Sequence, residues 1–119
     1  SLLEDDRRDL DPAIRSHILD RYFDAMGDTY DRDVFDLHMA VLGAHRHSKN
    51  MANFIRIPVQ TGKDKYLDYI PQATVWFNQC IQHPYLEPLK KWFDKHCPDY
   101  NEPITKLRKW KSIPPLTQE

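Results

Sequence analysis

An all-α fold of four to five helices is predicted by three features of the sequence. Apolar side chains recur every three or four positions through most of residues 1–97, which is the period of an amphipathic helix. Strand patterns are nearly absent, because the β-like run at residues 54–59 is interrupted by Pro58, and proline removes a hydrogen-bond donor from a sheet. Prolines and aspartates also stand where helices are expected to begin.

The first helix is expected to start at Pro12 with Asp11 as its N-cap. Proline tolerates the first helical position, and an aspartate side chain can accept a hydrogen bond from the free N–H groups of the first turn. Apolar side chains then recur at every fourth position, which predicts a helix to about residue 29. These side chains are Ile14, Ile18, Tyr22 and Met26.

The second helix is predicted to begin at Asp33, as a cap, and to run to about Ile55. Gly43 and Ala44 are small, so a neighbouring helix can approach closely there. A loop is expected at residues 58–62. The apolar stripe of this helix begins with Val34, Leu37, Val41 and Leu42.

Two further helices are expected after a short helical turn at residues 63–69. Pro71 can open a helix that runs to about Gln82, and Pro84 or Pro88 can open a last helix toward His96. Helical spacing groups Val75, Trp76, Gln79 and Cys80 in the first, and Leu86, Leu89, Trp92 and Phe93 in the second. The aromatic side chains assigned to the core are Trp76, Trp92 and Phe93.

Residues 98–119 carry four of the nine prolines and are predicted to form an extended tail beyond the helical unit of residues 1–97. The tail includes the run KLRKWK at residues 106–111. Basic segments with an aromatic can bind nucleic acid or anionic lipid. Because this one is short and lies among acidic residues, a solvated tail is favoured.

The charge of the chain is nearly balanced but unevenly distributed. The net charge of −1 argues against general attraction to nucleic acid or membranes. Residues 1–36 hold 11 Asp/Glu and 5 Lys/Arg, whereas residues 37–119 hold 7 and 12. The two halves can therefore attract each other, or each can face a further partner.

Cys80 and Cys97 are isolated and lack the spacing of a metal-binding motif. We expect two reduced, half-buried thiols in a cytoplasmic protein. The sequence has no signal peptide and no apolar run of membrane-spanning length. Because the first residue is Ser1 and not Met, a truncated piece of a longer protein is expected, although removal of a tag can also leave serine.

Two segments carry a resemblance to a known family. Residues 43–71 read GAHRHSKNMANFIRIPVQTGKDKYLDYIP, and residues 1–9 read SLLEDDRRD. Together they resemble the C-terminal helical end of the aminoglycoside phosphotransferase/choline kinase superfamily. The likeness is greatest to bacterial anomeric kinases of N-acetylmuramate and N-acetylglucosamine, some of which are fused to a tRNA-modification ATPase. It covers roughly residues 1–97 and is absent from the tail.

The resemblance implies a helical C-lobe subdomain of an ATP- and Mg²⁺-dependent kinase for a small substrate, with an amino sugar expected. Such kinases need a phosphate-covering loop, a strand lysine, a catalytic aspartate and a magnesium-binding aspartate. The sequence contains no GxGxxG, no GxxxxGK[ST], no HxD and no DFG. We therefore assign no catalytic residue, and the chain by itself is expected to be inactive. The missing lobes are expected before residue 1, as its partner in the same polypeptide.

A basic helix is the first candidate for substrate binding. Arg46, His47 and Lys49 match the family pattern GxQRHxK, with His45 in place of Gln and Ser48 in place of Leu. Arg46 and Lys49 are three apart and share a helix face, which can contact sugar hydroxyls or phosphate. A solvated basic face, or a salt bridge to the acidic first helix, remains an equal alternative.

An N-terminal acidic and basic pair is a candidate for supporting the active site. Asp5 and Arg7 match the family segment LLQDARRD, which lies beside the catalytic core in those kinases. They can orient active-site loops, but an ion-pair network at a helix end is favoured.

Tyr66 is the remaining substrate-binding candidate. With Lys63 and Tyr69 it matches DGKxxYLxxIP, with Thr61 where Asp is common. Tyrosine rings can stack on a sugar, but packing of a short helix against its neighbours is favoured here.

No metal site is predicted. His45 and His47 would point about 200° apart on a helix, and His38 and His45 would lie about 10 Å apart along its axis. No third ligand has a suitable spacing.

Two other classes of function remain open. The chain can be a helical interaction module that forms homo-oligomers, or a small nucleic-acid binder that uses Arg46, Lys49 and residues 106–111. A mass that depends on concentration favours the first, and salt-dependent binding of DNA or RNA favours the second. Nucleic acid and membranes are not expected as partners.

Overall fold

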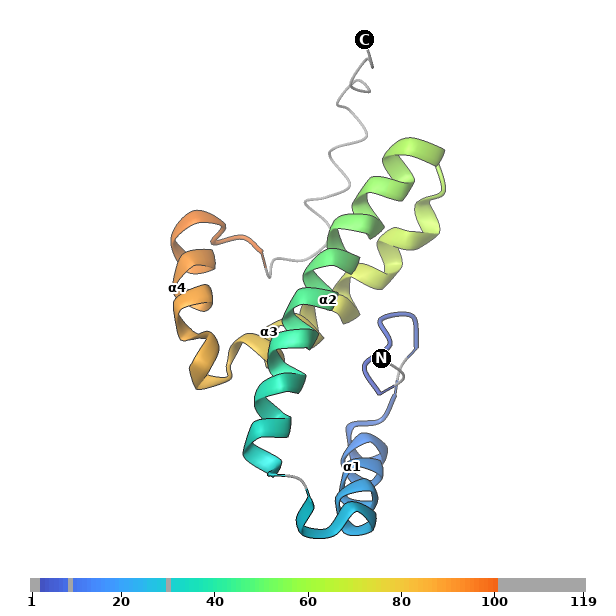
Figure 1. The fold of residues 1–119 in the computed structure, drawn as a ribbon. Helices are drawn as coiled ribbons and strands as arrows, with labels where there is room; N and C mark the ends of the chain where they lie inside the picture. The colour runs from blue at the N-terminus through green and yellow to red at the C-terminus, as the bar shows by residue number, and fades with distance from the viewer. Residues whose placement is uncertain (1–2, 9, 30, 101–119) are drawn as a thin grey trace.

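The computed structural model describes residues 3–8, 10–29 and 31–100. Within these ranges the regular structure is helical, with no strand, so the predicted all-α class is confirmed. Four α-helices are joined by short 3₁₀ turns (Figure 1). The α-helices are α1 (Pro12–Met26), α2 (Arg32–Thr61), α3 (Ile70–Ile81) and α4 (Glu87–His96). The 3₁₀ turns are η1 (Gly27–Thr29), η2 (Asp64–Tyr69) and η3 (Pro84–Leu86).

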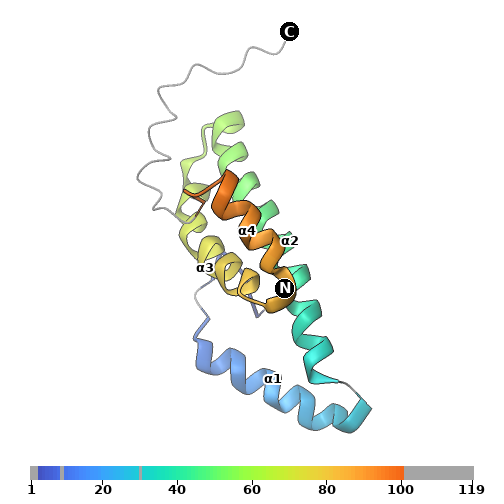
Figure 2. The same ribbon diagram turned by 90° about the vertical axis from the view of Figure 1, so that its left-hand side faces the viewer.

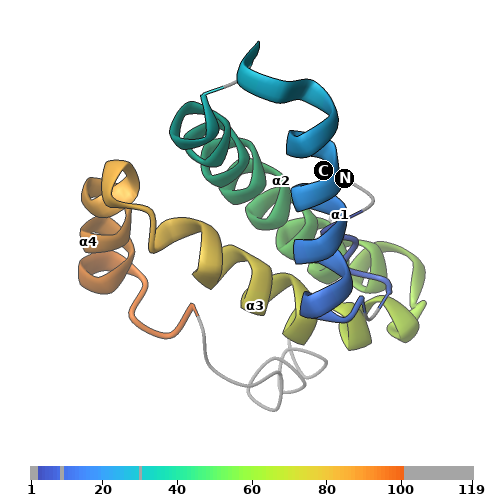
Figure 3. The ribbon, with the colours of Figure 1, turned by 90° about the horizontal axis from the view of Figure 1, so that it is seen from below.

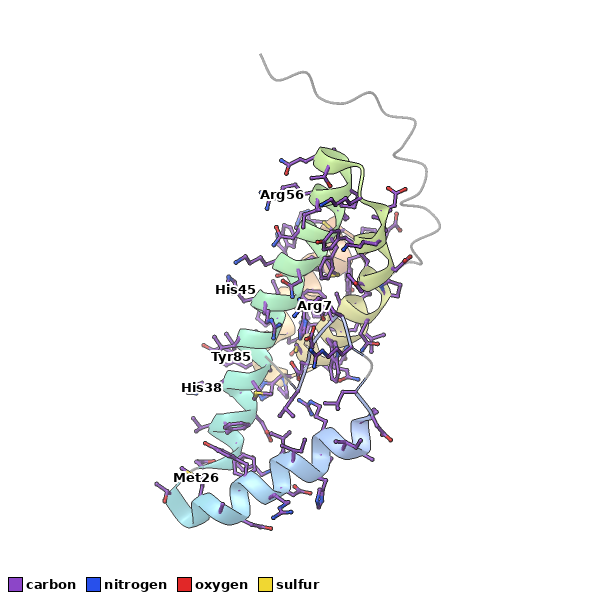
Figure 4. The ribbon with its side chains drawn as sticks, turned by 90° about the vertical axis from the view of Figure 1, so that its right-hand side faces the viewer. Arg7, Met26, His38, His45, Arg56 and Tyr85 are labelled. Atoms are coloured by element: carbon purple, nitrogen blue, oxygen red, sulfur yellow. The ribbon has the colours of Figure 1, made fainter. Side chains whose placement is uncertain are left out.

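The long helix α2 organises the molecule. α3 returns along the C-terminal half of α2 after η2, and α4 follows on the far side of α3 (Figures 1 and 2). α1 and the N-terminal half of α2 form an open V that is joined at η1 (Figure 2). The view from below shows α1 in front of α2, on the opposite side of the molecule from α4 (Figure 3). Residues 3–8 lie between the start of α1 and the α2–α3 pair (Figure 4).

The apolar core lies between α2 and α3. Its first cluster consists of Ala44, Phe77, Cys80 and Ile81, against which Met51, Leu86, Leu89, Phe93 and Tyr100 pack. Its second cluster consists of Phe54, Leu67, Ile70 and Ala73, against which Met51, Ile55, Tyr66 and Tyr69 pack. Met51 contacts both clusters, so they form one seam along α2.

The starts of α1 and α2 follow local signals, with one correction. Asp11 caps α1 as predicted, since its carboxylate accepts a hydrogen bond from the N–H of Ala13 at 2.8 Å. The cap of α2 is Asp31 and not Asp33, because the Asp31 carboxylate accepts from the N–H groups of Asp33 and Val34. An acidic side chain in the first turn also interacts favourably with the helix dipole, so Asp33 still stabilises the start of α2.

The predicted loop at residues 58–62 is wrong. α2 continues through Pro58 to Thr61, and Gly62 ends it with a left-handed φ of 73°. A proline inside a helix loses one backbone hydrogen bond. Here the last turns of α2 pack on η2 and α3, with Phe54 and Pro58 buried, and this burial offsets the loss.

Several apolar side chains expected to be buried are exposed. Trp92, assigned to the core, is 52% exposed, whereas Trp76 is buried and Phe93 is half-buried. None of the side chains of α1 is buried. Both cysteines are free thiols, but the prediction that they are half-buried is wrong, because Cys80 is buried and Cys97 is exposed. The predicted tail, with its basic run at 106–111, lies almost wholly outside the described residues.

Candidate functional site

Three consecutive carboxylates lie in the interior, where residues 3–8 cross between α1 and the α2–α3 pair. Glu4, Asp5 and Asp6 are each less than a tenth exposed. Burial of a charge is costly unless the charge is paired and hydrogen-bonded. The surroundings of these carboxylates therefore define the main polar site of the described residues.

His47 on α2 is the principal partner of two of these carboxylates. The residue is 0% exposed. Its Nε2 lies 3.2 Å from Glu4 Oε2, and its Nδ1 lies 2.8 Å from Asp6 Oδ1. The second approach is an ion pair that is poorly aligned for a hydrogen bond. The imidazole also stacks on Trp76 of α3, with ring centroids 6.3 Å apart.

Arg15 and Asn50 complete the pairing of the two carboxylates. Arg15 Nη2, on α1, lies 2.6 Å from Glu4 Oε1, and the guanidinium carbon stands 5.6 Å from the Trp76 ring centroid. Asn50 Nδ2 donates to Asp6 Oδ2 at 2.7 Å. Glu4 therefore links α1 to α2, and Asp6 is held at both oxygens by α2.

The pairing shifts the proton affinities of the buried groups. Burial alone would raise the pKa of the Glu4 carboxyl, but hydrogen bonds from His47 and Arg15 outweigh burial, and the pKa is lowered. Burial alone would lower the pKa of His47, but Asp6 and Glu4 outweigh it, and the pKa is raised. Both shifts favour the charged forms.

Cys80 on α3 lies beside the Glu4 carboxylate. One donor atom each of Cys80, Glu4 and His47 lies within 4.8 Å of the other two. Gly43 makes this approach possible. A Cβ at Gly43 would lie 2.6 Å from Cys80 Sγ and 3.3 Å from Glu4 Oε2. Burial, with a contribution from the Glu4 charge, raises the pKa of the Cys80 thiol to about 12, so the thiol is protonated at neutral pH.

Arg46, a predicted substrate-binding residue, lines a pocket beside the buried carboxylates. It is half-buried, and its Nη1 is buried without a hydrogen-bond partner among the described residues. A pocket of about 200 Å³ is bounded by Arg46 with Leu3, Glu4 and Gly43, and by Leu19, Phe35, Met39 and Leu42. Arg46 is therefore available to a ligand that enters between residues 3–8, α1 and α2.

The other predicted substrate-binding residues are placed apart from this pocket. Lys49 is exposed, and His47 is enclosed by its two carboxylates. Tyr66 packs in an aromatic group with Phe54 and Tyr69, at centroid distances of 6.4 and 6.1 Å. Phe54 is eight residues beyond Arg46, about 12 Å along α2. The structure does not bring Tyr66 and Arg46 together.

Asp5 and Arg7 form a local ion-pair network with Arg8, in the turns before α1 and not at a helix end as predicted. Asp5 Oδ1 accepts hydrogen bonds from the backbone N–H of Arg7 at 3.0 Å and from its Nε at 3.3 Å, and Arg8 Nε lies 3.8 Å from Oδ2. The backbone hydrogen bond is the largest cause of the lowered pKa of Asp5. Both guanidinium groups are largely exposed, so these pairs contribute little to stability.

Sequence reasoning missed Glu4, Asp6, Arg15 and Cys80 as members of one site. Acidic side chains are normally solvated, so an EDD run gives no sign of burial. The usable signal was the glycine at position 43, which permits a close approach, and which stands one helical turn before His47 on the same face.

Comparison with known proteins gives one informative match. No family model matches the sequence, and no solved structure matches it. An N-acetylmuramate/N-acetylglucosamine kinase of Caulobacter vibrioides is 36% identical over 97 residues, which is 82% of this chain and 26% of that protein. The chain thus spans about a quarter of the length of this relative. It is related to one part of a kinase.

A search of the described helices for a membrane span found none with the required length and apolarity.

Proposed function

We propose that this chain is the helical part of the C-lobe of an ATP-dependent phosphotransferase of the aminoglycoside phosphotransferase type, acting on an amino sugar. The observation that carries the proposal is the 36% identity over 97 residues to a protein named as an N-acetylmuramate/N-acetylglucosamine kinase. The transfer chemistry, ATP and Mg²⁺ belong to further lobes of the same polypeptide. ATP dependence implies a cytoplasmic location.

Within this function, Arg46 would contact the substrate side of the active site. Its partly unpaired guanidinium faces the pocket beside Leu3 and Glu4. Guanidinium groups donate to sugar hydroxyls and phosphate oxygens with a fixed geometry. Lys49 and Tyr66 lie apart from this pocket, since Lys49 is exposed and Tyr66 packs on Phe54, so either would contact only a part of the substrate that extends beyond Arg46.

His47 would not contact the substrate but would position the segment that lines the Arg46 pocket. Its contacts with Glu4 and Asp6 hold residues 3–8 against α2, and these residues form one side of the Arg46 pocket. Asp5 and Arg7 would support the same segment from its outer side. The position of residues 3–8 beside the pocket would therefore depend on the buried ion pairs of His47 with Glu4 and Asp6.

The test is a kinase assay on the whole polypeptide with ATP, Mg²⁺ and N-acetylmuramate or N-acetylglucosamine. Arg46→Ala should lower kcat/KM for the sugar about ten- to a hundredfold, the effect of one lost charge-assisted contact of about 1.5–3 kcal/mol. The KM for ATP should hardly change. The 119-residue chain alone should consume no ATP.

Arg56→Ala is the matched control. Arg56 is exposed on the same helix, contacts Asn53 at 3.1 Å, and projects from the side of α2 away from α3 (Figure 4). It should behave as the parent protein. If Arg46→Ala lowers the melting temperature and leaves the sugar kinetics unchanged, Arg46 is part of the scaffold. If the whole polypeptide phosphorylates neither sugar, the substrate assignment fails.

A further inference from the structure

Beyond any kinase function, the interior of the chain contains three side chains that can share one metal ion. Glu4, His47 and Cys80 come from residues 3–8, α2 and α3, and all three are buried. Their donor atoms lie within 4.8 Å of one another. We propose that they form a site for a borderline-soft divalent cation, Zn²⁺, which fastens the N-terminal segment to the α2–α3 pair.

The donor set fits zinc. Zinc accepts thiolate, imidazole and carboxylate ligands in tetrahedral geometry. Glu4 Oε2 and His47 Nε2 are 3.2 Å apart, the separation of two ligands that make bonds of about 2.0–2.2 Å at an angle near 100°. An ion can thus enter between these two atoms with little movement. Cys80 Sγ then needs to approach as a third ligand.

The atoms that surround the ligands are arranged to hold them. Asp6 Oδ1 lies 2.8 Å from His47 Nδ1, so a small turn of the ring would let Nδ1–H donate to this carboxylate and leave Nε2 for the metal, as is usual for zinc-bound histidine. Arg15 occupies Glu4 Oε1 and leaves Oε2 facing the histidine. Gly43 leaves the space in which Sγ and Oε2 meet.

A cavity reaches two of the three ligand residues. A cavity of about 380 Å³ is lined by Glu4 and Cys80, together with Arg15, Met39, Ala40 and Gln79, among others. Water in this cavity can complete the coordination, which is the arrangement of sites with three protein ligands. The same cavity gives the ion access to the buried donors. On binding, the Cys80 thiol and the Nε2 of the protonated His47 each release a proton to solvent, because the ligands are the thiolate and the neutral imidazole.

The stabilising effect should be large because the ion would join three segments that are far apart in sequence. Metal that binds only the folded chain raises its melting temperature in proportion to the logarithm of the metal concentration. At a hundredfold excess over the Kd, a rise on the order of 10 °C is expected for a domain of this size.

The experiment is a Co²⁺ and Zn²⁺ titration of the untagged, reduced 119-residue chain after removal of metal with a chelator. Co²⁺ should bind one to one, with the absorption bands of tetrahedral cobalt and a thiolate-to-cobalt charge-transfer band. Zn²⁺ should displace it and raise the melting temperature. Mg²⁺ should do neither, because it prefers oxygen ligands.

Matched variants locate the site. Cys80→Ser should abolish the thiolate band and the zinc-dependent rise in melting temperature, and Glu4→Gln should weaken binding at least tenfold, with folding checked by circular dichroism. Cys97→Ser should retain both signals, because Cys97 is the exposed thiol of the chain. The proposal is overturned by absence of the band in the parent chain, by its survival in Cys80→Ser, or by a parent chain that zinc neither orders nor stabilises.

Discussion

α1 and the α2–α3 pair are held in the molecule in different ways. The α2–α3 seam is built from apolar side chains, with Phe77 and Ile81 each 1% exposed. None of the side chains of α1 is buried, and its stripe residues Ile14 and Ile18 are 50% and 42% exposed. A periodic apolar stripe indicates that one face of a helix is suited to burial. It does not show that other residues of this chain bury that face.

The contacts that α1 does make are mainly ionic and aromatic. Arg15 pairs with Glu4, and Arg32 of α2 pairs with Asp20 at 3.1 Å. Phe23 meets Phe35 edge to face with centroids 4.8 Å apart. The side chains of the Arg32–Asp20 pair are both more than half exposed, and such pairs stabilise little, whereas the Arg15–Glu4 pair is partly buried. We therefore expect α1 to depend on further surface for its packing, whereas the α2–α3 pair is held by its own core and by the His47 cluster.

The largest expected effect is on the α2–α3 side. His47→Ala leaves Glu4 and Asp6 buried without their shared partner, which typically costs about 3–5 kcal/mol. Urea unfolding of the metal-free chain measures this loss as a lower midpoint. His45→Ala is the control, since His45 is exposed and projects away from α3 (Figure 4), and its change should be within about 0.5 kcal/mol. Equal midpoints for both variants would contradict the role assigned to His47.

A second, smaller effect is a stability maximum at weakly acid pH in the metal-free chain. The pKa of His47 is raised in the folded state, so its contribution is complete below its unfolded pKa of about 6.5 and is lost as pH rises through the folded value. The pKa of Glu4 is lowered, so its contribution is complete above about 4.5 and is lost as pH falls through the folded value.

Melting temperatures measured from pH 4 to pH 9 test this linkage. They should fall on the alkaline side in the parent chain and in His45→Ala. The fall should be absent in His47→Gln, which cannot be protonated. Stability that increases steadily above pH 6.5 in the parent chain would show that the pairing of His47 with Glu4 and Asp6 does not depend on the charge of the imidazole.

Substitutions in the exposed stripe of α1 are expected to have the smallest effect on stability. They should instead change the self-association of the chain. Exposed apolar patches of a few hundred Å² commonly find a partner, so we expect the isolated chain to self-associate through Ile14, Ile18 and Tyr22. Ile18→Asp should reduce the sedimentation mass across a hundredfold concentration range and change the unfolding free energy by about 1 kcal/mol or less. Ser16→Asp, an exposed position on the opposite face of α1, should leave the mass unchanged.

If the parent chain is a strict monomer at every concentration, the exposed stripe of α1 needs no partner, and the contrast between the two regions is weaker than their burial indicates.

The sequence by itself determined where several helices begin. Asp11 and Pro12 open α1, and Pro71 lies in the first turn of α3. These signals work because a cap acts on backbone groups within three or four residues. They were insufficient at Pro58, where a local preference to break the helix was overridden by packing on η2 and α3.

Only the tertiary structure decided which side chains are buried. The sequence does not indicate how far Trp92 or the acidic run of residues 4–6 is buried. In the structure the Trp92 indole is half exposed and the three carboxylates are buried. Sequence alone matched Arg46 and His47 as adjacent basic residues, and the fold turns one toward a pocket and the other toward two carboxylates. The physical reason is distance in sequence. Glu4, His47 and Cys80 meet although they are 43 and 33 residues apart along the chain, and no local pattern encodes such a contact.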